Sequence, residues 1–436
     1  MSELQTVRGM RDLLGPEMEI RNYLKSIAVD VFTCYGYEPL DSPAMELWET
    51  LSAKGGEEVE AETFKFTDKG DREVGLRFDL TVPLARIVAS NLHLPKPFKR
   101  YAIGKAWRYD RPQAGRYREF LQADADIIGS DSPAADAEVV LLALEFARRT
   151  FGKDYIVKVN NRKVLRGLIE VAGVSENLAN GCFRAMDKLE KIGKNGVQDE
   201  LQKRGISESA TEFLLGVVGV KGKNKAIFSE FRQILKGSKI GLEGTAELEF
   251  MADIFDSCEV NEYIEFDISL ARGLDYYTGP VFEGKYLGEP DVGSILAGGR
   301  YDNLVEKFGG PSTPATGISL GLDRIVDILL EQDYASKLET DLDVFFAPIN
   351  RDMVKHGMRL RNILVEMDFK CDIDLMDRPL GTLLELADSK NASYTIIVGE
   401  RDLKKGVVSL RNMKTKETET VNLKEFRNAL PELLER

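Results

Sequence analysis

Short strand-like runs separated by turn residues restrict the fold of this chain more than any other feature. They fall at residues 63–66, 75–78, 99–104, 120–129, 263–270 and 280–286. A long amphipathic pattern at 17–35 predicts one helix ahead of them. Many short strands with few helices between them predict a mostly antiparallel sheet in an α+β domain.

Two other stretches have different patterns and divide the chain. Residues 161–240 are helical in pattern and carry a charge of +6, whereas 241–340 carry −14 and the whole chain of 436 residues carries −13. Near the C-terminus strands and helices alternate, which predicts a small α/β domain with a partly parallel sheet. The predicted parts are a core in two segments (1–160 and 246–330), a helical insertion (161–245), a linker (331–341) and a C-terminal α/β domain (342–436).

Several protein classes are disfavoured by what the sequence lacks. Its four cysteines are far apart and form no C-x-x-C pair, so neither a disulfide framework nor a zinc ribbon is indicated. No secretory signal and no apolar run of about 18–20 residues is visible, so we expect a cytoplasmic protein without a membrane span. With two histidines and no P-loop motif, a Ser-His-Asp triad or a P-loop nucleotide site is not expected.

The most basic segment runs from Lys96 to Arg118 and contradicts the acidic total. It holds eight basic residues against one acid, Asp110, and its basic side chains interleave with Tyr101, Trp107 and other aromatic residues. One interpretation is a solvated strand–loop–strand at a sheet edge. The other is a polyanion site, because arginine offers paired donors to phosphate and aromatic rings stack on bases.

Three polar residues follow that segment at every second position. In a strand Gln122, Asp124 and Asp126 share one face, because side chains alternate. They could form a polar face that is simply exposed to solvent, or equally a site for a ligand with an ammonium or imidazole group.

Three glycine-containing segments complete the candidate set. Residues 270–279 place Arg272 among apolar residues before a pair of tyrosines, which suits either a cation in a pocket or a structural Arg–Asp pair. Residues 296–302 contain adjacent glycines, which permit close approach of a ligand but also occur in ordinary turns. Residues 317–325 read as a glycine-spaced strand that leads into a helix with Arg324 near its start.

Taken in this order, the segments resemble the class II aminoacyl-tRNA synthetases, and specifically the histidyl-tRNA synthetase family. Residues 107–120 look like the motif 2 of that class, 317–325 like motif 3, and the helix ending near Tyr35 with 39–43 like motif 1. Residues 272–277 and 297–302 are similar to two peptides peculiar to the histidine enzymes. The resemblance implies an antiparallel sheet flanked by helices, with a helical insertion and a C-terminal α/β anticodon-binding domain.

The resemblance also implies roles for individual residues. The catalytic residues it implies are Arg272 and Arg108. The residues it implies for ATP are Arg108, Asp110, Arg116, Phe120 and Arg324, with Phe120 stacked on adenine. The residues it implies for histidine are Asp79, Thr81 and Gln122 at the ammonium group, and Asp126, Tyr276, Tyr277 and Tyr301 around the imidazole.

The implied activity is histidine–tRNA ligation. Its implied partners are L-histidine, ATP with Mg²⁺, tRNA(His) and a second copy of the chain through motif 1, and no membrane is expected. Arg378 and residues 399–406 are candidates for anticodon reading, and the 161–240 segment for the acceptor arm. The alternative is a catalytically inert paralogue that regulates ATP phosphoribosyltransferase or senses tRNA. Such paralogues usually lack the 272–277 peptide or the C-terminal domain, and both are present here.

Overall fold

The chain divides into two compact units in a computed structural model, Met1–Ala335 and Ser336–Arg436. The structure describes residues 4–53, 57–112, 115–217, 219–223, 225–271, 276–288, 293–338 and 342–433. Within those ranges, no helix combines the length and the apolar character that crossing a membrane requires.

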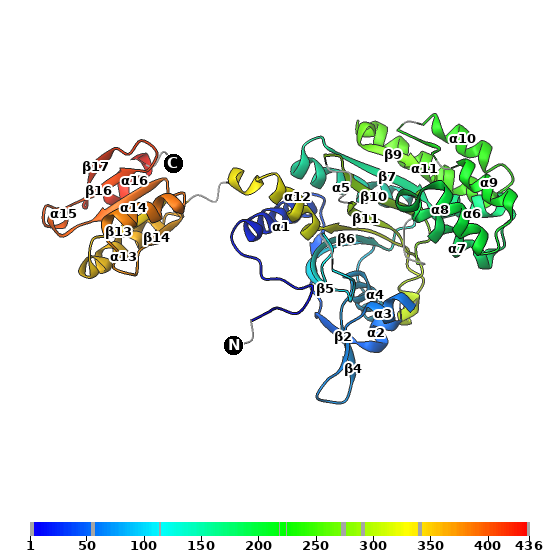
Figure 1. The fold of residues 1–436 in the computed structure, drawn as a ribbon, viewed down its shortest axis with the longest axis horizontal. Coiled ribbons are helices and arrows are strands. Elements are labelled where there is room, and N and C mark those ends of the chain that lie inside the picture. Colours follow the sequence, from blue (N-terminus) through cyan, green and yellow to red (C-terminus); the bar gives the residue numbers. More distant parts are fainter. Residues whose placement is uncertain are drawn as a thin grey trace. The chain divides into compact units, whose positions relative to one another are not determined.

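A nine-stranded sheet forms the centre of the first unit, in the order β1-β5-β6-β12-β11-β10-β7-β9-β8 (Figure 1). Neighbouring strands are antiparallel except for the pairs β1–β5 and β7–β9. The strands are β1 (Glu38–Pro39), β5 (Phe98–Trp107), β6 (Glu119–Ile128), β7 (Tyr155–Asn161), β8 (Lys221–Gly222), β9 (Ile264–Asp267), β10 (Pro280–Tyr286), β11 (Ser294–Arg300) and β12 (Ala315–Gly321). The prediction of a mostly antiparallel sheet in an α+β domain is therefore confirmed.

Three helices cover one face of this sheet: α1 (Pro16–Cys34), α5 (Pro133–Phe151) and α12 (Leu322–Glu331). Helix α1 forms where the amphipathic pattern predicts it, with proline in its first turn and a buried stripe of Ile20, Leu24, Ile27 and Val31. The side chain of Ser132 caps α5 by accepting a hydrogen bond from the backbone N–H of Ala134. Helix α4 (Thr81–Ser90) lies on the opposite face of the sheet, where its apolar residues pack on Ile128 of β6.

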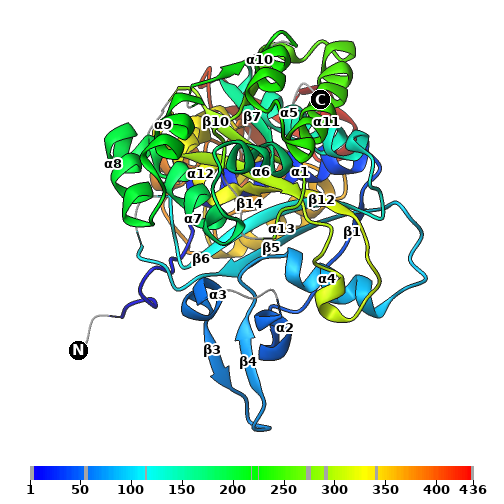
Figure 2. The ribbon, with the colours of Figure 1, turned by 90° about the vertical axis from the view of Figure 1, so that its right-hand side faces the viewer.

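The runs predicted at 63–66 and 75–78 belong to a separate small sheet rather than to the large one. This sheet has the order β2-β4-β3, and β3 and β4 form a hairpin that extends away from the large sheet (Figure 2). Its elements are β2 (Met45–Leu47), α2 (Trp48–Ser52), α3 (Glu57–Glu62), β3 (Lys65–Thr67) and β4 (Glu73–Leu76). The hairpin turn is closed by Asp68, whose carboxylate accepts hydrogen bonds from the backbone of Gly70 and Arg72.

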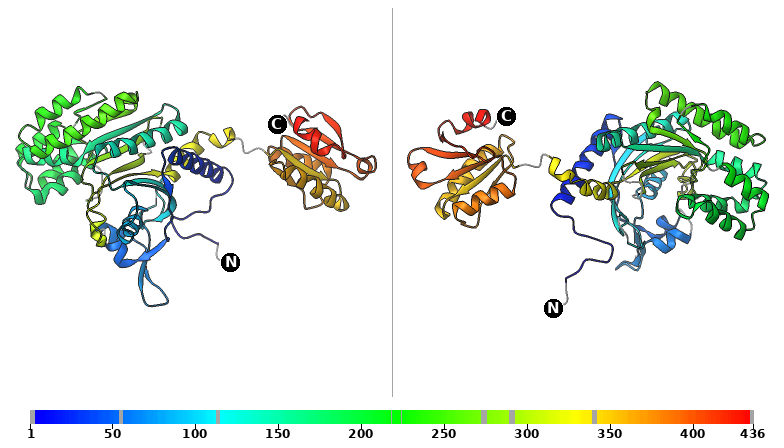
Figure 3. Two further views of the ribbon diagram at one scale, coloured as in Figure 1. Left: turned by 180° about the vertical axis from the view of Figure 1, so that it is seen from behind. Right: turned by 45° about the horizontal axis from the view of Figure 1, so that its top comes forward.

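Helices gather at the β7 end of the large sheet, within the segment predicted to be an insertion (Figure 3). They are α6 (Arg162–Val171), α7 (Glu176–Asp187), α8 (Leu189–Lys203), α9 (Glu208–Val217), α10 (Ile227–Ile234) and α11 (Lys239–Ser257). Short 3₁₀ turns lie at η1 (Asn261–Tyr263), η3 (Glu306–Phe308) and η4 (Tyr334–Lys337). Helix α11 continues through residue 245, where the sequence placed the end of the insertion.

The second unit is a five-stranded sheet with helices, in the order β14-β13-β15-β16-β17. Strand β13 pairs in parallel with β14 and β15, and the other pairs are antiparallel, as the partly parallel prediction requires. Its elements are β13 (Val344–Pro348), α13 (Arg351–Val365), β14 (Cys371–Ile373), α14 (Leu380–Ser389), β15 (Tyr394–Val398), α15 (Glu400–Lys404), β16 (Val407–Asn412), β17 (Thr418–Asn422) and α16 (Phe426–Leu433). Apolar residues of α13 and α16 bury one face of this sheet, and those of α14 pack on the other.

Candidate active site

The face of strands β5, β6, β12 and β11 opposite α1, α5 and α12 carries the predicted residues Gln122 and Asp126, and we call it the site face. Cross-strand pairing aligns Arg100, Asp126, Gly317 and Gly299 in one row. The adjacent row holds Ala102, Asp124, Ser319 and Ala297, and the next holds Gly104, Gln122 and Gly321. Small residues therefore flank the polar side chains of these rows.

Glycine is required at two points of the first row. A Cβ atom on Gly317 would collide with the carboxylate of Asp126. A Cβ atom on Gly299 would lie 2.7 Å from the carbonyl oxygen of Pro280 and 3.1 Å from the ring of Tyr277. These glycines allow Asp126 and Tyr277 to lie directly against the sheet.

Asp126 is the centre of a buried polar cluster. A guanidinium nitrogen of Arg100, which is fully buried, lies 2.7 Å from Asp126 Oδ2. The hydroxyl of Tyr301 donates a hydrogen bond to Asp126 Oδ1. Burial raises the pKa of Asp126, and the charge of Arg100 opposes that rise.

Three tyrosine rings lie beside this carboxylate. The ring centroids of Tyr276 and Tyr277 are 4.5 Å apart, and those of Tyr276 and Tyr301 are 6.1 Å apart. Burial, together with the nearby charges of Asp126, Asp124 and others, raises the pKa of Tyr277 to about 12, so its hydroxyl is neutral at ordinary pH. The cluster can enclose a flat polar group such as an imidazole with hydroxyl and carboxylate partners.

The neighbouring polar residues on β6 are incompletely paired. The side-chain N–H of Gln122 donates to the hydroxyl of Ser319 at 2.5 Å, but Gln122 Oε1 is buried without a partner. Asp124 is 2% exposed and its Oδ1 likewise has no partner. Unpaired buried polar atoms are costly, and a bound ligand is one way to satisfy them.

Asp79 and Thr81 reach the site from the start of α4. Asp79 Oδ1 accepts hydrogen bonds from the backbone N–H groups of Thr81 at 3.1 Å and Val82 at 2.9 Å, so it caps this helix. The charge of Asp79 raises the pKa of Asp124 and of Tyr277, which places it in the same cluster. The structure thus brings together all seven residues predicted for histidine.

The predicted ATP residues lie at the other end of β6. The Nε of Arg108 donates to the carbonyl of Phe78 at 3.0 Å, and its guanidinium carbon lies 5.2 Å from the ring centre of Phe120. Asp110 and Arg116 pair with each other at 2.8 Å. Arg324, at the start of α12, donates to the carbonyls of Ser294 and, at 3.5 Å, of Gly115.

The eight basic side chains of residues 96–118 do not share one environment in the structure. Four are paired with acids: Lys99 with Glu138, Arg100 with Asp126, Lys105 with Glu119, and Arg116 with Asp110. The interpretation of the whole segment as one polyanion site was therefore too broad. The register of β5 against β6, which local patterns do not reveal, decides that Arg100 lies beneath Asp126.

A second set of contacts that the sequence did not predict joins the end of the basic loop to α12. The hydroxyl of Tyr117 donates to Asp327 Oδ2 at 2.9 Å, and Arg11 bonds the same carboxylate at 3.3 Å. The Arg11 guanidinium also lies 3.8 Å over the ring of Tyr117. One turn earlier, Asp323 accepts from the backbone of Leu121 and from Arg21. The sequence signal that could have indicated these contacts is the spacing of Asp323 and Asp327, which places both carboxylates on one face of a helix.

Arg272 lies outside the described residues, so its predicted role stays a prediction. A residue of β7 holds the segment that precedes Arg272. The side-chain N–H₂ of Asn160 donates to the carbonyls of Ile268 at 2.9 Å and Leu270 at 3.0 Å. Arg300, in the second glycine peptide, lies on the opposite face of the sheet and pairs with Asp136 of α5 at 2.7 Å.

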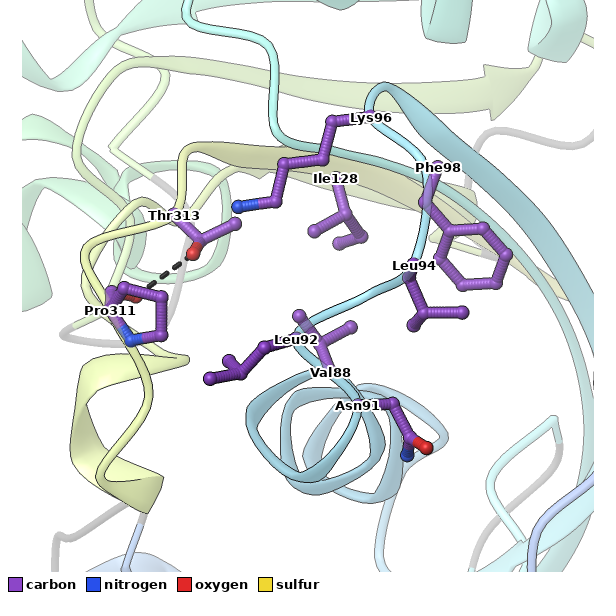
Figure 4. Close-up of a pocket in the computed structure, with 9 residues that line it drawn as sticks. All are labelled: Val88, Asn91, Leu92, Leu94, Lys96, Phe98, Ile128, Pro311 and Thr313. Atoms are coloured by element: carbon purple, nitrogen blue, oxygen red, sulfur yellow. Dashed lines mark hydrogen bonds between the residues drawn. The ribbon is translucent and has the colours of Figure 1, made fainter.

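A small pocket beyond Ile128 does not contain the predicted residues (Figure 4). It is lined by Val88, Asn91, Leu92, Leu94, Lys96, Phe98, Ile128, Pro311 and Thr313. Because its lining contains no carboxylate, arginine or tyrosine, we assign the chemistry to the site face instead.

The large antiparallel sheet, with buried carboxylates at its centre and an arginine-aromatic loop at the end of the same strands, defines a class II aminoacyl-tRNA synthetase. Comparisons with known proteins identify the family. Residues 9–325 match the family model described as histidyl-tRNA synthetase, and residues 343–433 match the anticodon binding domain. The chain belongs to the histidyl-tRNA synthetase family.

Relatives and solved structures agree with this assignment. The chain is 37% identical to the histidine–tRNA ligase of Pyrococcus horikoshii, covering 99% of this chain and 100% of the relative. It is 40% identical to that of Aeropyrum pernix, covering 98% of each. The crystal structure of histidyl-tRNA synthetase from Nostoc sp. PCC 7120 superposes with a TM-score of 0.85 at 29% identity, covering 100% of both chains.

The protein is therefore an enzyme that activates L-histidine with ATP and transfers it to the 3′ end of its tRNA. A structure titled as an ATP phosphoribosyltransferase regulatory subunit/histidyl-tRNA synthetase, from Bacillus halodurans, is also similar, with a TM-score of 0.72. At 23% identity it shows the fold alone. Nothing in the comparisons favours the regulatory alternative.

Proposed function

We propose that the site face binds histidine over the row Arg100, Asp126, Gly317 and Gly299. The imidazole lies against Asp126 and the three tyrosines Tyr276, Tyr277 and Tyr301. The ammonium group lies toward Asp79, Thr81 and Gln122. The observation that supports this placement is the buried Asp126, which is held by Arg100 and Tyr301 and lies opposite Gly317.

ATP then occupies the loop end of the same strands. Phe120 stacks on adenine with Asp110 near the edge of the base, and Arg108 holds the α-phosphate. Arg116 and Arg324 hold the outer phosphates, which requires Arg116 to leave Asp110 and Arg324 to leave the carbonyl of Gly115.

The reaction needs positioning and charge stabilisation rather than a protein nucleophile. The carboxylate of histidine attacks the α-phosphorus and expels pyrophosphate, and the terminal ribose hydroxyl of tRNA then attacks the adenylate. Negative charge disperses over the α-phosphate in the transition state. We expect Arg108 and Arg272 to stabilise that charge, and one well-placed donor of this kind is worth about 3–4 kcal/mol.

Mg²⁺ is proposed to enter with ATP. Among the described residues, no group of three or more His, Cys, Asp or Glu side chains could hold a metal ion. Mg²⁺ commonly binds substrate phosphates with only one or two protein carboxylates. Mg²⁺ held by the phosphates of ATP would therefore need few ligands from this chain.

Replacing Arg272 with alanine tests the assignment of the reaction centre. We expect histidine-dependent ATP–pyrophosphate exchange to fall about 100-fold or more, because a cation at the α-phosphate is lost. Wild-type exchange, measured with each of the twenty amino acids, is expected to respond to histidine alone. Near-normal exchange in Arg272→Ala, with the fold retained by circular dichroism, would show that Arg272 is not catalytic.

The two outer parts of the chain are proposed to bind tRNA. The helical insertion, residues 161–245, contacts the acceptor arm through phosphates, and residues 342–436 read the anticodon. Arg378 and residues 399–406 are the proposed reading elements. Arg378 pairs with Asp374, directly after β14, at 2.7 Å.

Exposed lysines of the insertion provide a test of the acceptor-arm proposal. Replacing Lys194, Lys203 and Lys236 together with alanine should weaken tRNA binding and reduce the slope of log affinity against log salt by about 2–3, because each phosphate contact releases counterions. Pyrophosphate exchange should stay near wild type. The matched control replaces the exposed Lys69, Lys153 and Lys307. Equal salt slopes for the two triple variants would refute the proposal.

The remaining proposals concern assembly and location. Helix α1 and residues 39–43 form the motif 1 element, and we propose that two chains associate through it as a homodimer. We also propose that the enzyme works in the cytoplasm, where the ATP and tRNA that it consumes are found.

A further inference from the structure

Asp124 has features that the proposed histidine contacts leave unused. Its carboxylate lies on the site face between Gln122 and Asp126, and its Oδ1 is buried without a partner. Ser319, opposite it on β12, hydrogen-bonds to the carboxylate. On the β5 side the paired residue is Ala102, whose side chain offers no hydrogen-bond donor to the carboxylate.

Further carboxylates lie close to Asp124. The titratable or polar groups that face it come from every packed element: Asp126 of β6, Arg100 of β5, Ser319 of β12, Asp79 before α4, Arg77 after β4 and Tyr277 before β10. Arg100 already contacts Asp126 at 2.7 Å, and Arg77 is hydrogen-bonded to backbone carbonyls of Ser42 and Lys105. Burial first, and then the charges of Asp126 and Asp79, raise the pKa of Asp124 to about 7.

We propose that Asp124 is a histidine-binding carboxylate that holds a proton in the empty pocket and releases it when the ammonium group of histidine enters. This inference rests on the proposed placement of histidine on the site face. The balance is simple: the neutral acid and the ammonium ion become a carboxylate–ammonium pair, and one proton passes to the solvent. The ammonium ion brings a positive charge to Asp124 and Asp79, whereas Asp126 already lies against the positive charge of Arg100.

The sign of the pH dependence follows from this balance. Below about pH 7 the empty pocket holds the proton, which must leave before the pair forms, so histidine affinity falls as pH falls. Above that pH the carboxylate is already ionised and its full attraction is available. Histidine also titrates, with an imidazole pKa of about 6.5, so the comparison must be made between variants on the same ligand.

Calorimetric titration with histidine, in buffers of different ionisation enthalpy, measures the released proton. At pH 7 the wild type should release about half a proton more than Asp124→Asn. The variant should bind histidine about 10- to 100-fold more weakly at pH 8, and that ratio should shrink about tenfold at pH 6. Asp131→Asn, at an exposed aspartate beyond the same strand, should match the wild type throughout.

The possible results distinguish a wrong placement of histidine from a wrong proton linkage at Asp124. If Asp124→Asn leaves histidine affinity unchanged at both pH values, histidine does not lie where we placed it. If it weakens binding equally at pH 6 and pH 8 with no change in proton release, the placement holds and the proton linkage is wrong. Should Asp124→Asn fail to fold, Ser319→Ala removes a hydrogen bond that lowers the pKa of Asp124. Proton release in that variant should extend to higher pH, and an unshifted profile would also overturn the linkage.

Discussion

Replacing Arg108 with alanine is expected to lower the rate of histidine-dependent ATP–pyrophosphate exchange by about 100-fold or more. Arg108 is held in place before ATP arrives, by its bond to the carbonyl of Phe78 and by the ring of Phe120 beneath it. A cation fixed in this way does not reorganise when charge develops on the α-phosphate. Its loss should therefore appear in kcat more than in the KM for ATP.

Two further variants show whether the geometry of Arg108 matters. Arg108→Lys keeps the charge but loses the planar fork, so it should recover only part of the rate. Arg111→Ala, at an exposed arginine three residues later, should stay near wild type. An Arg108→Ala enzyme within about threefold of wild type would remove Arg108 from the reaction centre.

The second large effect concerns stability. Asp126→Asn should reduce the free energy of unfolding by about 3–5 kcal/mol, because it leaves the fully buried guanidinium of Arg100 without its counter-charge. Denaturant unfolding followed by circular dichroism measures this change. Histidine activation should be lost in the same variant, since the proposed imidazole partner is gone.

A double variant separates stability from activity. Arg100→Met combined with Asp126→Asn removes the unpaired charge, so most of the lost stability should return. Histidine activation should not return, because Asp126 is still absent. If Asp126→Asn alone costs less than about 1 kcal/mol, the Arg100–Asp126 pair does not hold this part of the sheet together.

The sequence was sufficient for the elements whose pattern is local. The amphipathic period predicted α1, and the alternation of Gln122, Asp124 and Asp126 correctly placed the three side chains on one face of a strand. The alternating pattern near the C-terminus likewise predicted the mixed sheet of the second unit. In each case the signal lies within about ten consecutive residues.

Contacts between distant segments were not predictable in the same way. Arg100 counted toward a basic loop, yet pairing of β5 with β6 places it under Asp126. The bond of Tyr117 and Arg11 to Asp327 joins three segments that only the folded sheet brings together. The double use of Asp79, as a helix cap and as a pocket carboxylate, depends on where α4 packs. These features follow from register and packing, which one sequence does not encode locally.

The strand order has a consequence for the growing polypeptide on the ribosome. Strand β12 lies between β6 and β11, although nearly two hundred residues separate it from β6 along the chain. Until β12 has been synthesised, the hydrogen-bonding edge of β6 that it will occupy is open. The nascent N-terminal part therefore has an unpaired strand edge while the residues between β6 and β12 are synthesised. The arrival of one short, glycine-rich strand closes the edge and completes the pocket in a single event.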